Sequence, residues 1–548
     1  MSDSTTPQIG YVCEVGNARM IARFYPGREA EGEAIGDRQL RVGQIGSYVV
    51  VRQHELAILA QVLSASRETD GKTEAGEESC MVSLMPLGEI DAKGAFLRGV
   101  RYYPTVGAPV CMADIRDIET LFKAYHRYGY TVGYLATLSN IEVSLNPSTL
   151  FGRHFAILGQ SGSGKSWAVT SLIQRAVAAM PKAHIILLDL HGEYCWRDEH
   201  DIIRTAFHEE IVRHIDAREL EIPYWLMTYA ELVDLLIDRT DRDATMQMAF
   251  LREVMYHMKK KAAAQLGVKA VSIDSPIYFS MVELYQQFKS ANEQRGDFGK
   301  SKGALYGLFD EFLVKLQSRL NDVRYDFLLK PKRRTNSESL TSLLRDFVGL
   351  GQRKRQVTVI DLSYVPFDVR PSVSAQIGRL AFEFNYWNPR NREFPILLLC
   401  EEAHAYIPRE GGTQYDGTRK SMERIAKEGR KYGVGLGVVS QRPHELSETV
   451  LSQCGTFICL RITNPDDQAY IRALVPEGES NLVDILTVLG RGEAVVMGEA
   501  SPLPTRFQLY KPDPPPNSND VDFHTYWKSG PDDLDIDDIV FKWRRQGR

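Results

Sequence analysis

The segment Gly159-Gln160-Ser161-Gly162-Ser163-Gly164-Lys165-Ser166 fits the pattern G-x-x-x-x-G-K-[ST]. It follows the apolar run Phe155-Ala-Ile-Leu158, which predicts a buried strand, and it precedes residues 167–180, whose apolar spacing predicts a helix. Glycines let backbone N–H groups turn inward around phosphates, and the start of a helix adds positive potential. We therefore predict a phosphate-binding loop in which Lys165 reaches the β/γ oxygens and Ser166 ligates Mg²⁺. The alternative is a glycine-rich turn that matches the pattern by chance.

Further apolar runs of strand length follow the loop and alternate with helical stretches. These predicted strands are residues 184–189, 356–361, 394–400, 435–440 and 456–460. Strands that alternate with helices are typical of a parallel sheet covered on both faces. The sequence therefore predicts an α/β fold with a doubly wound core.

The flanking regions have different patterns, and at 548 residues the chain is long enough for several domains. Short β-type runs from Gln8 to about Met112 predict a small antiparallel barrel, with a mobile polar loop over residues 67–78. Residues 205–351 show amphipathic helical spacing and predict a helical subdomain inserted into the core. A proline-rich stretch then leads to Trp527 and Trp543, which indicates either an arm that docks on another surface or a partly disordered tail.

The composition sets limits on the class of protein. Charged residues make up 25% of the chain and the formal net charge is −5, so any contact with nucleic acid requires a local basic surface. The 7 cysteines form no C-x-x-C pair, which is typical of reduced, structural cysteines. There is no signal-type start and no apolar run of the length that a membrane span requires. We therefore expect a cytoplasmic protein.

Two adjacent carboxylates follow the predicted strand 394–400. Glu401 is placed to hold the Mg²⁺ shell, and Glu402 is placed to orient or deprotonate an attacking water molecule. Acidic residues at this position could instead favour the dipole of a following helix. His404 has no second His or Cys at metal-ligand spacing, so we expect a structural or signalling role for it.

Polar residues further along the chain complete the expected ATPase site. Gln441 follows the predicted strand 435–440 and is placed to sense the γ-phosphate. The basic helix before that strand carries Arg424 and Arg430, and either arginine could cross a subunit interface as an arginine finger. The alternative is that these cations simply interact with the end of their own helix.

The clearest basic clusters lie near residues 330–334 and 353–355. They supply Lys332, Arg333, Arg353 and Arg355 as candidate contacts to DNA phosphates. Solvated surface loops are an equally good interpretation of these runs. There is no spacing typical of a helix-turn-helix or a zinc finger, so sequence-specific binding is not expected.

Several strings together resemble the HerA branch of the HerA/FtsK ATPases. They are the loop with Arg153-His-Phe before it, Asp189-Leu-His-Gly-Glu193-Tyr194, Glu401-Glu-Ala-His404, residues 425–433 and Ser440-Gln-Arg-Pro443. The resemblance implies a RecA-like ring of six subunits that hydrolyses ATP with Mg²⁺ and pumps double-stranded DNA. It also implies the domain boundaries: a barrel over 1–112, a core over 113–204 and 352–510, an insertion over 205–351 and a C-terminal arm over 511–548 that reaches a neighbouring subunit.

The same resemblance assigns further residues to the ATP site. It implies that Arg153 contacts the nucleotide in cis and that Asp189 and Glu193 line the site. Glu401 departs from the family pattern, because many relatives carry aspartate at this position. The longer side chain is expected to shift the Mg²⁺ shell.

The leading hypothesis is an ATP-dependent DNA translocase that works with a separate effector, because no nuclease constellation is visible in this sequence. The resemblance implies an effector such as a NurA-like nuclease or a sirtuin-like enzyme that docks on the barrel, in DNA end processing, repair or anti-phage defence. A second hypothesis is a ring scaffold that is gated by nucleotide and activates an effector without translocation. A third is a conjugative or chromosome-segregation pump, and the absence of membrane spans argues against it.

Overall fold

The structure, a computed structural model, describes most of the chain. The described residues are 7–16, 19–25, 34–35, 38–39, 45–53, 56–69, 78–91, 96–113, 118, 121–122, 125–137, 139–198, 200–216, 218–296, 301–409 and 416–544. The chain forms two compact units. Unit 1 comprises residues 1–180, 441–444 and 454–512, and unit 2 comprises residues 181–440, 445–453 and 513–548.

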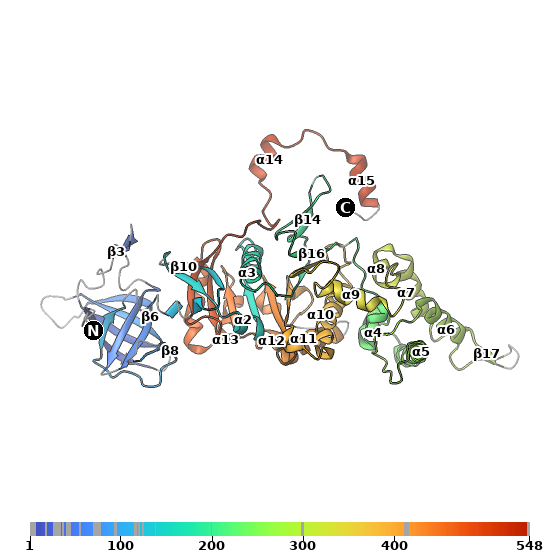
Figure 1. Cartoon of the computed structure of the whole chain (residues 1–548), viewed down its shortest axis with the longest axis horizontal. Helices are drawn as coiled ribbons and strands as arrows, with labels where there is room; N and C mark the ends of the chain where they lie inside the picture. Colours follow the sequence, from blue (N-terminus) through green and yellow to red (C-terminus); the bar gives the residue numbers. More distant parts are fainter. Residues whose placement is uncertain are drawn as a thin grey trace. The chain divides into compact units, whose positions relative to one another are not determined.

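Unit 1 begins with a closed β-barrel, drawn in blue in Figure 1. Its strands follow the order β2-β1-β9-β5-β6-β7-β8, and pairing of β2 with β7 closes it. The bounds are β1 (Gln8–Val15), β2 (Met20–Phe24), β5 (Tyr48–Gln53), β6 (Leu56–Thr69), β7 (Glu78–Ile90), β8 (Phe96–Arg98) and β9 (Pro109–Met112). Alternate residues such as Val49, Val51 and Val82 fill the interior, as the period of two in a strand requires. The predicted barrel is confirmed.

Two details of the barrel differ from the prediction. Residues 67–69 and 78 belong to β6 and β7 rather than to a loop, because the two strands continue to pair as far as Thr69 and Glu78. Residues 70–77, the rest of the predicted loop, lie outside the described residues. Strand β8 ends at Arg98, although the β-type sequence continues to Tyr103, and Gly99 follows it with a φ of 88°. A short separate hairpin joins β3 (Ala34–Ile35) to β4 (Arg38–Gln39).

The second part of unit 1 contains the glycine-rich segment. Strand β12 (Phe155–Leu158) pairs in parallel with β22 (Thr456–Cys459). Beyond β22 the sheet continues with antiparallel strands in the order β23 (Glu493–Gly498), β24 (Thr505–Leu509), β10 (Thr131–Leu135) and β11 (Glu142–Ser144). Helices of this part in the described residues include α2 (Pro147–Gly152), α3 (Lys165–Ala179), α13 (Pro465–Leu474) and the 3-10 segment η10 (Glu477–Val488).

Unit 2 is built on a parallel sheet in the order β21-β20-β13-β19-β16. Its strands are β13 (Ile185–Asp189), β16 (Val212–Ile215), β19 (Val357–Asp361), β20 (Ile396–Cys400) and β21 (Val434–Ser440). Helices α10 (Arg370–Trp387) and α11 (Asp416–Glu428) connect β19 to β20 and β20 to β21. All residues of β13, β19, β20 and β21 are buried, as expected for strands covered on both faces. The predicted α/β class is confirmed.

The interval 205–351 is mainly helical but also contributes strand β16 to the sheet. Its longer helices are α4 (Tyr229–Leu236), α5 (Ala244–Gln265), α6 (Met281–Glu293), α7 (Asp310–Asn321) and α9 (Ser339–Phe347). Short pieces are α8 (Asp326–Leu329), β17 (Arg295–Gly296), β18 (Ser301–Lys302), η2 (Tyr224–Leu226) and η4 (Val323–Tyr325). Before this interval, β14 (Cys195–Arg197) pairs with β15 (Ile203–Thr205). Aromatic side chains pack the interior of this region, with the rings of Phe288 and Phe312 stacked 4.1 Å apart.

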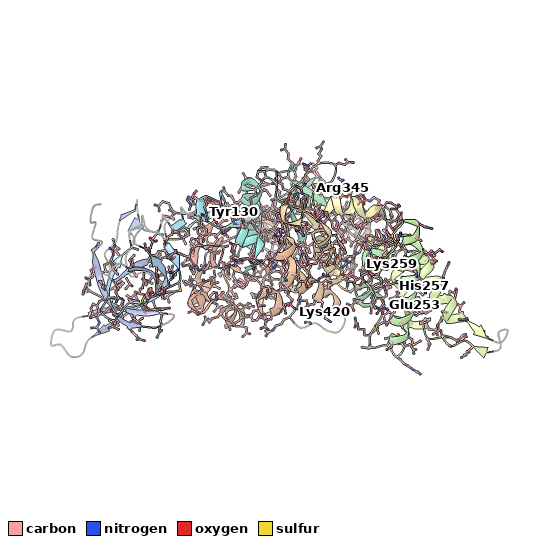
Figure 2. All side chains as sticks on the ribbon, turned by 60° about the horizontal axis from the view of Figure 1, so that its bottom comes forward. Tyr130, Glu253, His257, Lys259, Arg345 and Lys420 are labelled. Carbon is pink, nitrogen blue, oxygen red and sulfur yellow. The ribbon has the colours of Figure 1, made fainter. Side chains whose placement is uncertain are left out.

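Lys259 is a buried cation in this helical region and is labelled in Figure 2. Its ammonium group donates hydrogen bonds to the carbonyl oxygens of Ile273 and Ser275 at 2.8 and 2.9 Å. Burial lowers the pKa of Lys259 to about 8. The two carbonyls therefore fix the segment after α5 to the helix, because a buried donor and its acceptors must satisfy one another.

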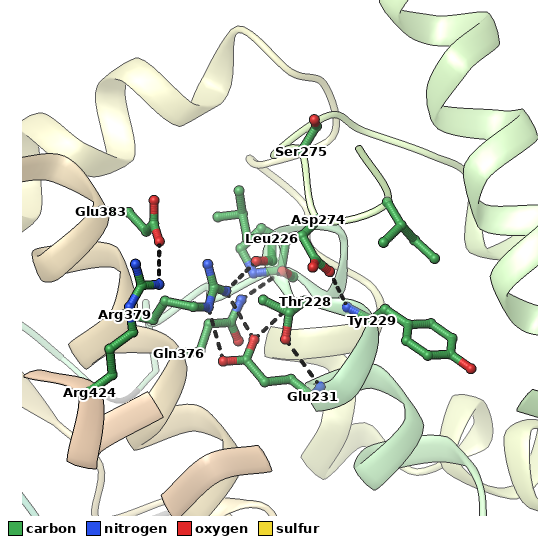
Figure 3. A network of polar contacts seen from close by, with 12 residues as sticks. Leu226, Thr228, Tyr229, Glu231, Asp274, Ser275, Gln376, Arg379, Glu383 and Arg424 are labelled. Atoms are coloured by element: carbon green, nitrogen blue, oxygen red, sulfur yellow. Dashed lines mark hydrogen bonds and ion pairs between the residues drawn. The ribbon is translucent and has the colours of Figure 1, made fainter. Parts of the chain in front are cut away.

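A buried ion pair joins α10 to the start of α4 (Figure 3). Arg379 on α10 donates from Nε and Nη2 to the two carboxylate oxygens of Glu231, each at 3.0 Å. The Arg379 and Glu231 side chains are only 14% and 1% exposed. Glu231 also caps α4, since it accepts a hydrogen bond from the backbone N–H of Thr228 at 2.9 Å. One carboxylate thus holds both the helix start and the neighbouring helix.

We expect Arg379→Ala to lower the free energy of unfolding of unit 2 by about 3–5 kcal/mol, because it leaves the Glu231 charge buried without a partner. The shift is measured as a lower midpoint of urea unfolding. Arg390→Ala is the matched control, since the Arg390–Glu393 pair is exposed and should leave the midpoint unchanged. Combining Arg379→Met with Glu231→Leu should restore most of the loss. Equal midpoints for Arg379→Ala and Arg390→Ala would contradict this account.

The C-terminal segment forms two helices, α14 (Phe523–Ser529) and α15 (Ile536–Arg544). Their aromatic residues are exposed, with Trp527 at 83% and Trp543 at 73%. Exposed aromatic rings on short helices are typical of a segment that packs on another surface.

No helix in the described parts of the chain has both the length and the apolarity of a membrane span. All 7 cysteines are free, and all except Cys13 are buried.

Candidate nucleotide site

The glycine-rich loop lies in unit 1, between β12 and α3, in the order that the sequence predicted. Gly162 and Gly164 have φ values of 72° and 99°, a region that L residues with a Cβ rarely adopt. A Cβ at Gly159 would lie 2.6 Å from the hydroxyl oxygen of Ser163. These glycines are therefore required by the backbone path, which begins α3 at Lys165 with Gly164 as its N-cap.

The loop is held by its own polar contacts. The side-chain oxygen of Gln160 accepts hydrogen bonds from the N–H and hydroxyl groups of Thr463 at 3.0 and 2.7 Å. The ammonium group of Lys165 lies over the loop and donates to the carbonyl oxygen of Gln160 at 3.3 Å. Gln160 thus has a structural role as well as its predicted place in a phosphate cradle. Lys165 and Ser166 stand in the first turn of α3, where the helix dipole favours anions.

The acidic residues gather in unit 2, at the carboxyl ends of β13 and β20. Asp189 ends β13 and is fully buried. Burial raises the pKa of Asp189 to about 7, and the N–H of Tyr194 opposes that shift. Its carboxylate accepts hydrogen bonds from successive backbone N–H groups, those of His191, Gly192, Glu193 and Tyr194. Asp189 therefore fixes the turn after β13, and this turn carries Glu193 and Tyr194.

Glu401 directly follows β20 and is only 3% exposed. The hydroxyl of Tyr194 donates a hydrogen bond to Glu401 Oε1 at 2.9 Å. Burial raises the pKa of Glu401 well above its ordinary value, and the charges of Asp189 and Glu193 raise it further. The Glu401 carboxylate thus lies within hydrogen-bond distance of Tyr194.

Glu402 has a strained backbone, with φ 44° and ψ 45°. It is one of few residues other than glycine with a positive φ in the described chain, and such strain is often found at functional sites. The conformation turns the chain sharply after β20 and begins the 3-10 segment η6 (Ala403–Ala405). Glu402 Oε2 lies 3.3 Å from Nδ1 of His404. The structure thus separates the two adjacent carboxylates into different surroundings.

The acidic residues near the ends of β13 and β20 carry oxygen atoms suited to a divalent cation. Glu193, Glu401 and Glu402 each have a buried Oε2 atom with no hydrogen-bond partner among the described residues. Oxygen atoms of this kind are ligands that Mg²⁺ prefers. Within the described residues, no group of three or more His, Cys, Asp or Glu side chains could hold a metal ion on its own. Mg²⁺ usually keeps water and phosphate oxygens among its ligands, so one or two of these carboxylates would be enough to hold it.

Gln441 directly follows β21 and is half-buried. The preceding residue, Ser440, is buried, and its hydroxyl oxygen lies 3.2 Å from Nδ1 of His404. Gln441 itself belongs to unit 1 and Ser440 to unit 2. Gln441 thus lies at the carboxyl end of a parallel strand, as the sequence predicted.

Arg153 stands before the strand that leads into the loop, as in the sequence. It follows α2 and precedes β12, whereas the loop begins at the other end of that strand. The length of β12 separates them by roughly 13 Å along the strand. The contact of Arg153 with the nucleotide that the resemblance implied stays a prediction, and in this structure its guanidinium is paired with Glu499.

The two candidate finger arginines have different surroundings. Arg424 on α11 forms ion pairs with Glu383 at 3.4 Å and Glu428 at 3.3 Å, and its guanidinium lies 4.7 Å from the ring centre of Phe382. Arg430 lies in the 3-10 segment η8 (Gly429–Tyr432) and is exposed. Among the residues that the structure describes, Arg430 makes no ion pair. The structure thus leaves Arg430 available to another molecule.

The basic clusters lie in unit 2 and are only partly available. The Arg333 side chain donates to the carbonyl oxygen of Glu219 at 2.9 Å, and the Arg355 side chain donates to that of Glu210. Lys332 and Arg353 are exposed. Lys332 and Arg353 therefore remain the better candidates for contact with a polyanion.

Sequence analysis did not assign roles to Tyr194 or Ser440. Both residues belong to the sequence motifs that carry the family resemblance. A tyrosine or a serine does not by itself indicate a contact with another residue of the site. Their contacts are with residues distant in the chain, so only folding reveals them. The capping role of Asp189 was also missed, although an aspartate at the end of a strand with a glycine three residues later, Asp189-Leu-His-Gly192, is typical of a side chain that caps a turn.

Family models match two regions of the chain. A model described as "Helicase HerA, central domain" matches residues 130–380, and one described as "Helicase HerA-like C-terminal" matches residues 396–514. Together they cover the glycine-rich loop, the acidic cluster, Gln441 and the helical region. The resemblance seen in the sequence is confirmed.

Curated relatives are similar over most of their length. The probable DNA double-strand break repair helicase HerA of Methanocaldococcus jannaschii is 30% identical over 469 residues, which are 80% of this chain and 88% of that protein. The DNA double-strand break repair helicase HerA of Pyrococcus furiosus is 29% identical over 72% of this chain and 73% of that protein. The counterpart in Sulfolobus acidocaldarius is 27% identical over 80% of each.

Solved structures show weaker similarity. VirB4 of Thermoanaerobacter pseudethanolicus aligns with a TM-score of 0.46 and 16% identity, over 70% of this chain and 96% of that chain. The bacterial conjugative coupling protein TrwB aligns with a TM-score of 0.44 and 14% identity, over 71% and 91%.

Proposed function

Because this chain belongs to the HerA family of helicases, which are DNA-processing ATPases, we propose that it is a hexameric, ATP-driven translocase of double-stranded DNA. The observation that carries the proposal is Glu402, a carboxylate held in a strained backbone conformation at the carboxyl end of β20, next to Glu401. A carboxylate in this position suits a general base for phosphoryl transfer to water.

The chain's own residues divide the chemistry between them. The N–H groups of the glycine-rich loop cradle the triphosphate, and the Lys165 ammonium neutralises charge on the β/γ oxygens. Glu402 orients the attacking water molecule and accepts its proton, and Gln441 contacts the γ-phosphate. Ser166, Glu401 and Glu193 would hold Mg²⁺, which when bound neutralises charge that develops on the phosphates.

A ring is part of the proposal because the site needs a cation from outside the chain. Arg153 pairs with Glu499, and Arg424 pairs with Glu383 and Glu428. Arg430 is exposed at the end of its helical segment and is the better candidate to reach a nucleotide on the next protomer. The C-terminal helices α14 and α15, with their exposed tryptophans, would pack on a neighbouring subunit.

The partner and the biological process complete the proposal. We place the ring in the cytoplasm, where its N-terminal barrel docks a separate effector, a NurA-like nuclease or a sirtuin-like enzyme. The process would be DNA end processing or anti-phage defence. Two curated relatives named as double-strand break repair helicases support the DNA-processing part.

The proposal is tested by measuring ATP turnover of the full chain with and without linear duplex DNA, together with the native mass. A hexamer whose turnover rises with duplex DNA supports it. A hexamer that binds ATP and is indifferent to duplex DNA would favour a nucleotide-gated scaffold. A monomer indifferent to ATP would remove both functions.

We expect Lys332→Ala and Arg353→Ala each to weaken duplex DNA binding by a similar factor for every sequence. Each should also reduce the slope of log affinity against log salt concentration by about 1, because one phosphate contact is lost. Binding is measured by fluorescence anisotropy at several salt concentrations. Lys289→Ala on α6 is the control, since Lys289 is exposed but lies outside both clusters. An unchanged slope in both cluster variants would exclude these residues as phosphate contacts.

A further inference from the structure

The imidazole of His404 lies between two oxygen atoms from different elements. Its Nδ1 is 3.3 Å from Glu402 Oε2 and 3.2 Å from the hydroxyl oxygen of Ser440. The His404 and Glu402 side chains are only 16% and 13% exposed, so water screens this contact weakly. One ring nitrogen therefore faces both the proposed general base and the last residue of β21.

The two oxygens compete for a single hydrogen. An ionised carboxylate only accepts hydrogen bonds, so Nδ1 must carry the proton when it faces Glu402. A ring nitrogen has one such hydrogen, and it can point well at only one acceptor. The contact with Ser440 has hydrogen-bond geometry, whereas Glu402 Oε2 has no hydrogen-bond partner among the described residues. In this structure the hydrogen-bond partner of Nδ1 is thus Ser440 rather than Glu402.

Ser440 connects this contact to the nucleotide-sensing position. It is fully buried at the end of β21, and the next residue is Gln441. A peptide unit is rigid, so a shift of the Gln441 backbone toward a phosphate also moves Ser440. Such a shift would alter the Ser440–His404 contact and with it the hydrogen that Nδ1 can direct to Glu402.

We propose that His404 is the positioning residue of Glu402 and that it couples this carboxylate to the strand end that carries Gln441. The inference rests on the proposed role of Glu402 as general base. With Nδ1–H directed to Glu402 Oε2, the other carboxylate oxygen is held in one orientation for the attacking water. With Nδ1–H directed to Ser440, Glu402 is free to rotate. His404 orients the base and does not contact the reacting atoms.

The test is a comparison of His404→Ala with His404→Asn in steady-state ATP hydrolysis. We expect His404→Ala to lower kcat by about 10–100-fold, the usual cost of losing a residue that orients a reacting group, with an unchanged KM and ATP affinity. The amide nitrogen of asparagine occupies nearly the place of Nδ1. His404→Asn should therefore recover most of kcat.

A matched control uses a second histidine–glutamate pair in the same chain. His257 Nε2 lies 2.7 Å from Glu253 Oε1 on the exposed side of α5, and both residues are labelled in Figure 2. His257→Ala should leave kcat and the unfolding midpoint unchanged. Similar melting temperatures for His404→Ala and the unmodified chain separate an effect on catalysis from an effect on folding.

Coupling to Ser440 is tested by a double-mutant cycle. If both side chains act through one hydrogen, Ser440→Ala combined with His404→Ala should be no slower than His404→Ala alone. Additive losses in the cycle, full activity of His404→Ala, or a parallel loss of ATP affinity would each overturn the proposal. Normal turnover by Glu402→Gln would instead remove the general base itself, so the two failures are distinguishable.

Discussion

The Glu402→Gln protein is expected to bind ATP with unchanged affinity and to hydrolyse it about 10²–10⁴-fold more slowly, the usual contribution of a general base. Glutamine has nearly the shape of glutamate and keeps the side chain next to His404. It cannot accept a proton from water, so only the chemical step is lost. Phosphate release measures hydrolysis, and a fluorescent ATP analogue measures binding.

The control for this substitution is Glu253→Gln, which removes a carboxylate from the exposed face of α5. It should change neither binding nor turnover. Normal hydrolysis by Glu402→Gln would show that another group activates the water. Weakened ATP binding in the same protein would indicate a structural role for Glu402, and would equally count against the general base.

Arg430→Ala is expected to lower turnover by a factor on the order of 10³–10⁵, the range found where an arginine finger is removed. Arg430 is exposed and makes no ion pair among the described residues, so alanine leaves no buried charge behind. Arg424→Ala should have a smaller effect on turnover, because Arg424 is already paired with Glu383 and Glu428. Steady-state hydrolysis of both variants, at equal native mass, makes the comparison.

Mixing experiments decide whether Arg430 acts on its own loop or on that of a neighbour. Lys165→Ala should be inactive because its loop lacks the phosphate-binding cation. If Arg430 acts in trans, mixed rings of Arg430→Ala and Lys165→Ala contain some interfaces with an intact loop and an intact arginine, and activity returns. No recovery in rings shown by mass to be mixed would exclude the trans role.

Local pattern was sufficient for the elements that carry the chemistry. The glycine spacing from Gly159 to Gly164 reflects backbone angles and close approaches that only glycine permits, so a short string predicted the loop. The strands β13, β20 and β21 are buried on both faces, and continuous apolar runs predicted them. Polar residues directly after such strands, Glu401, Glu402 and Gln441, followed from the same pattern.

Two features depended on more than local pattern. The role of Arg153 was implied by resemblance and stays a prediction, since Arg153 stands before β12 and the loop follows that strand. The strand β16 was not predicted, because Val212-Arg-His-Ile215 is short and contains polar residues. It pairs with β19 at one edge of the sheet, where a strand needs less apolar sequence than in the centre.

By itself the sequence determined the family, the α/β core, the phosphate loop and the paired carboxylates, because each depends on residues close together in the chain. Only the tertiary structure decided what holds those carboxylates. Tyr194 reaches Glu401 across 207 positions, and Ser440 meets His404 across 36. Such contacts depend on which strands become neighbours in the sheet. That order follows from the packing of the whole core, which no short stretch of sequence specifies.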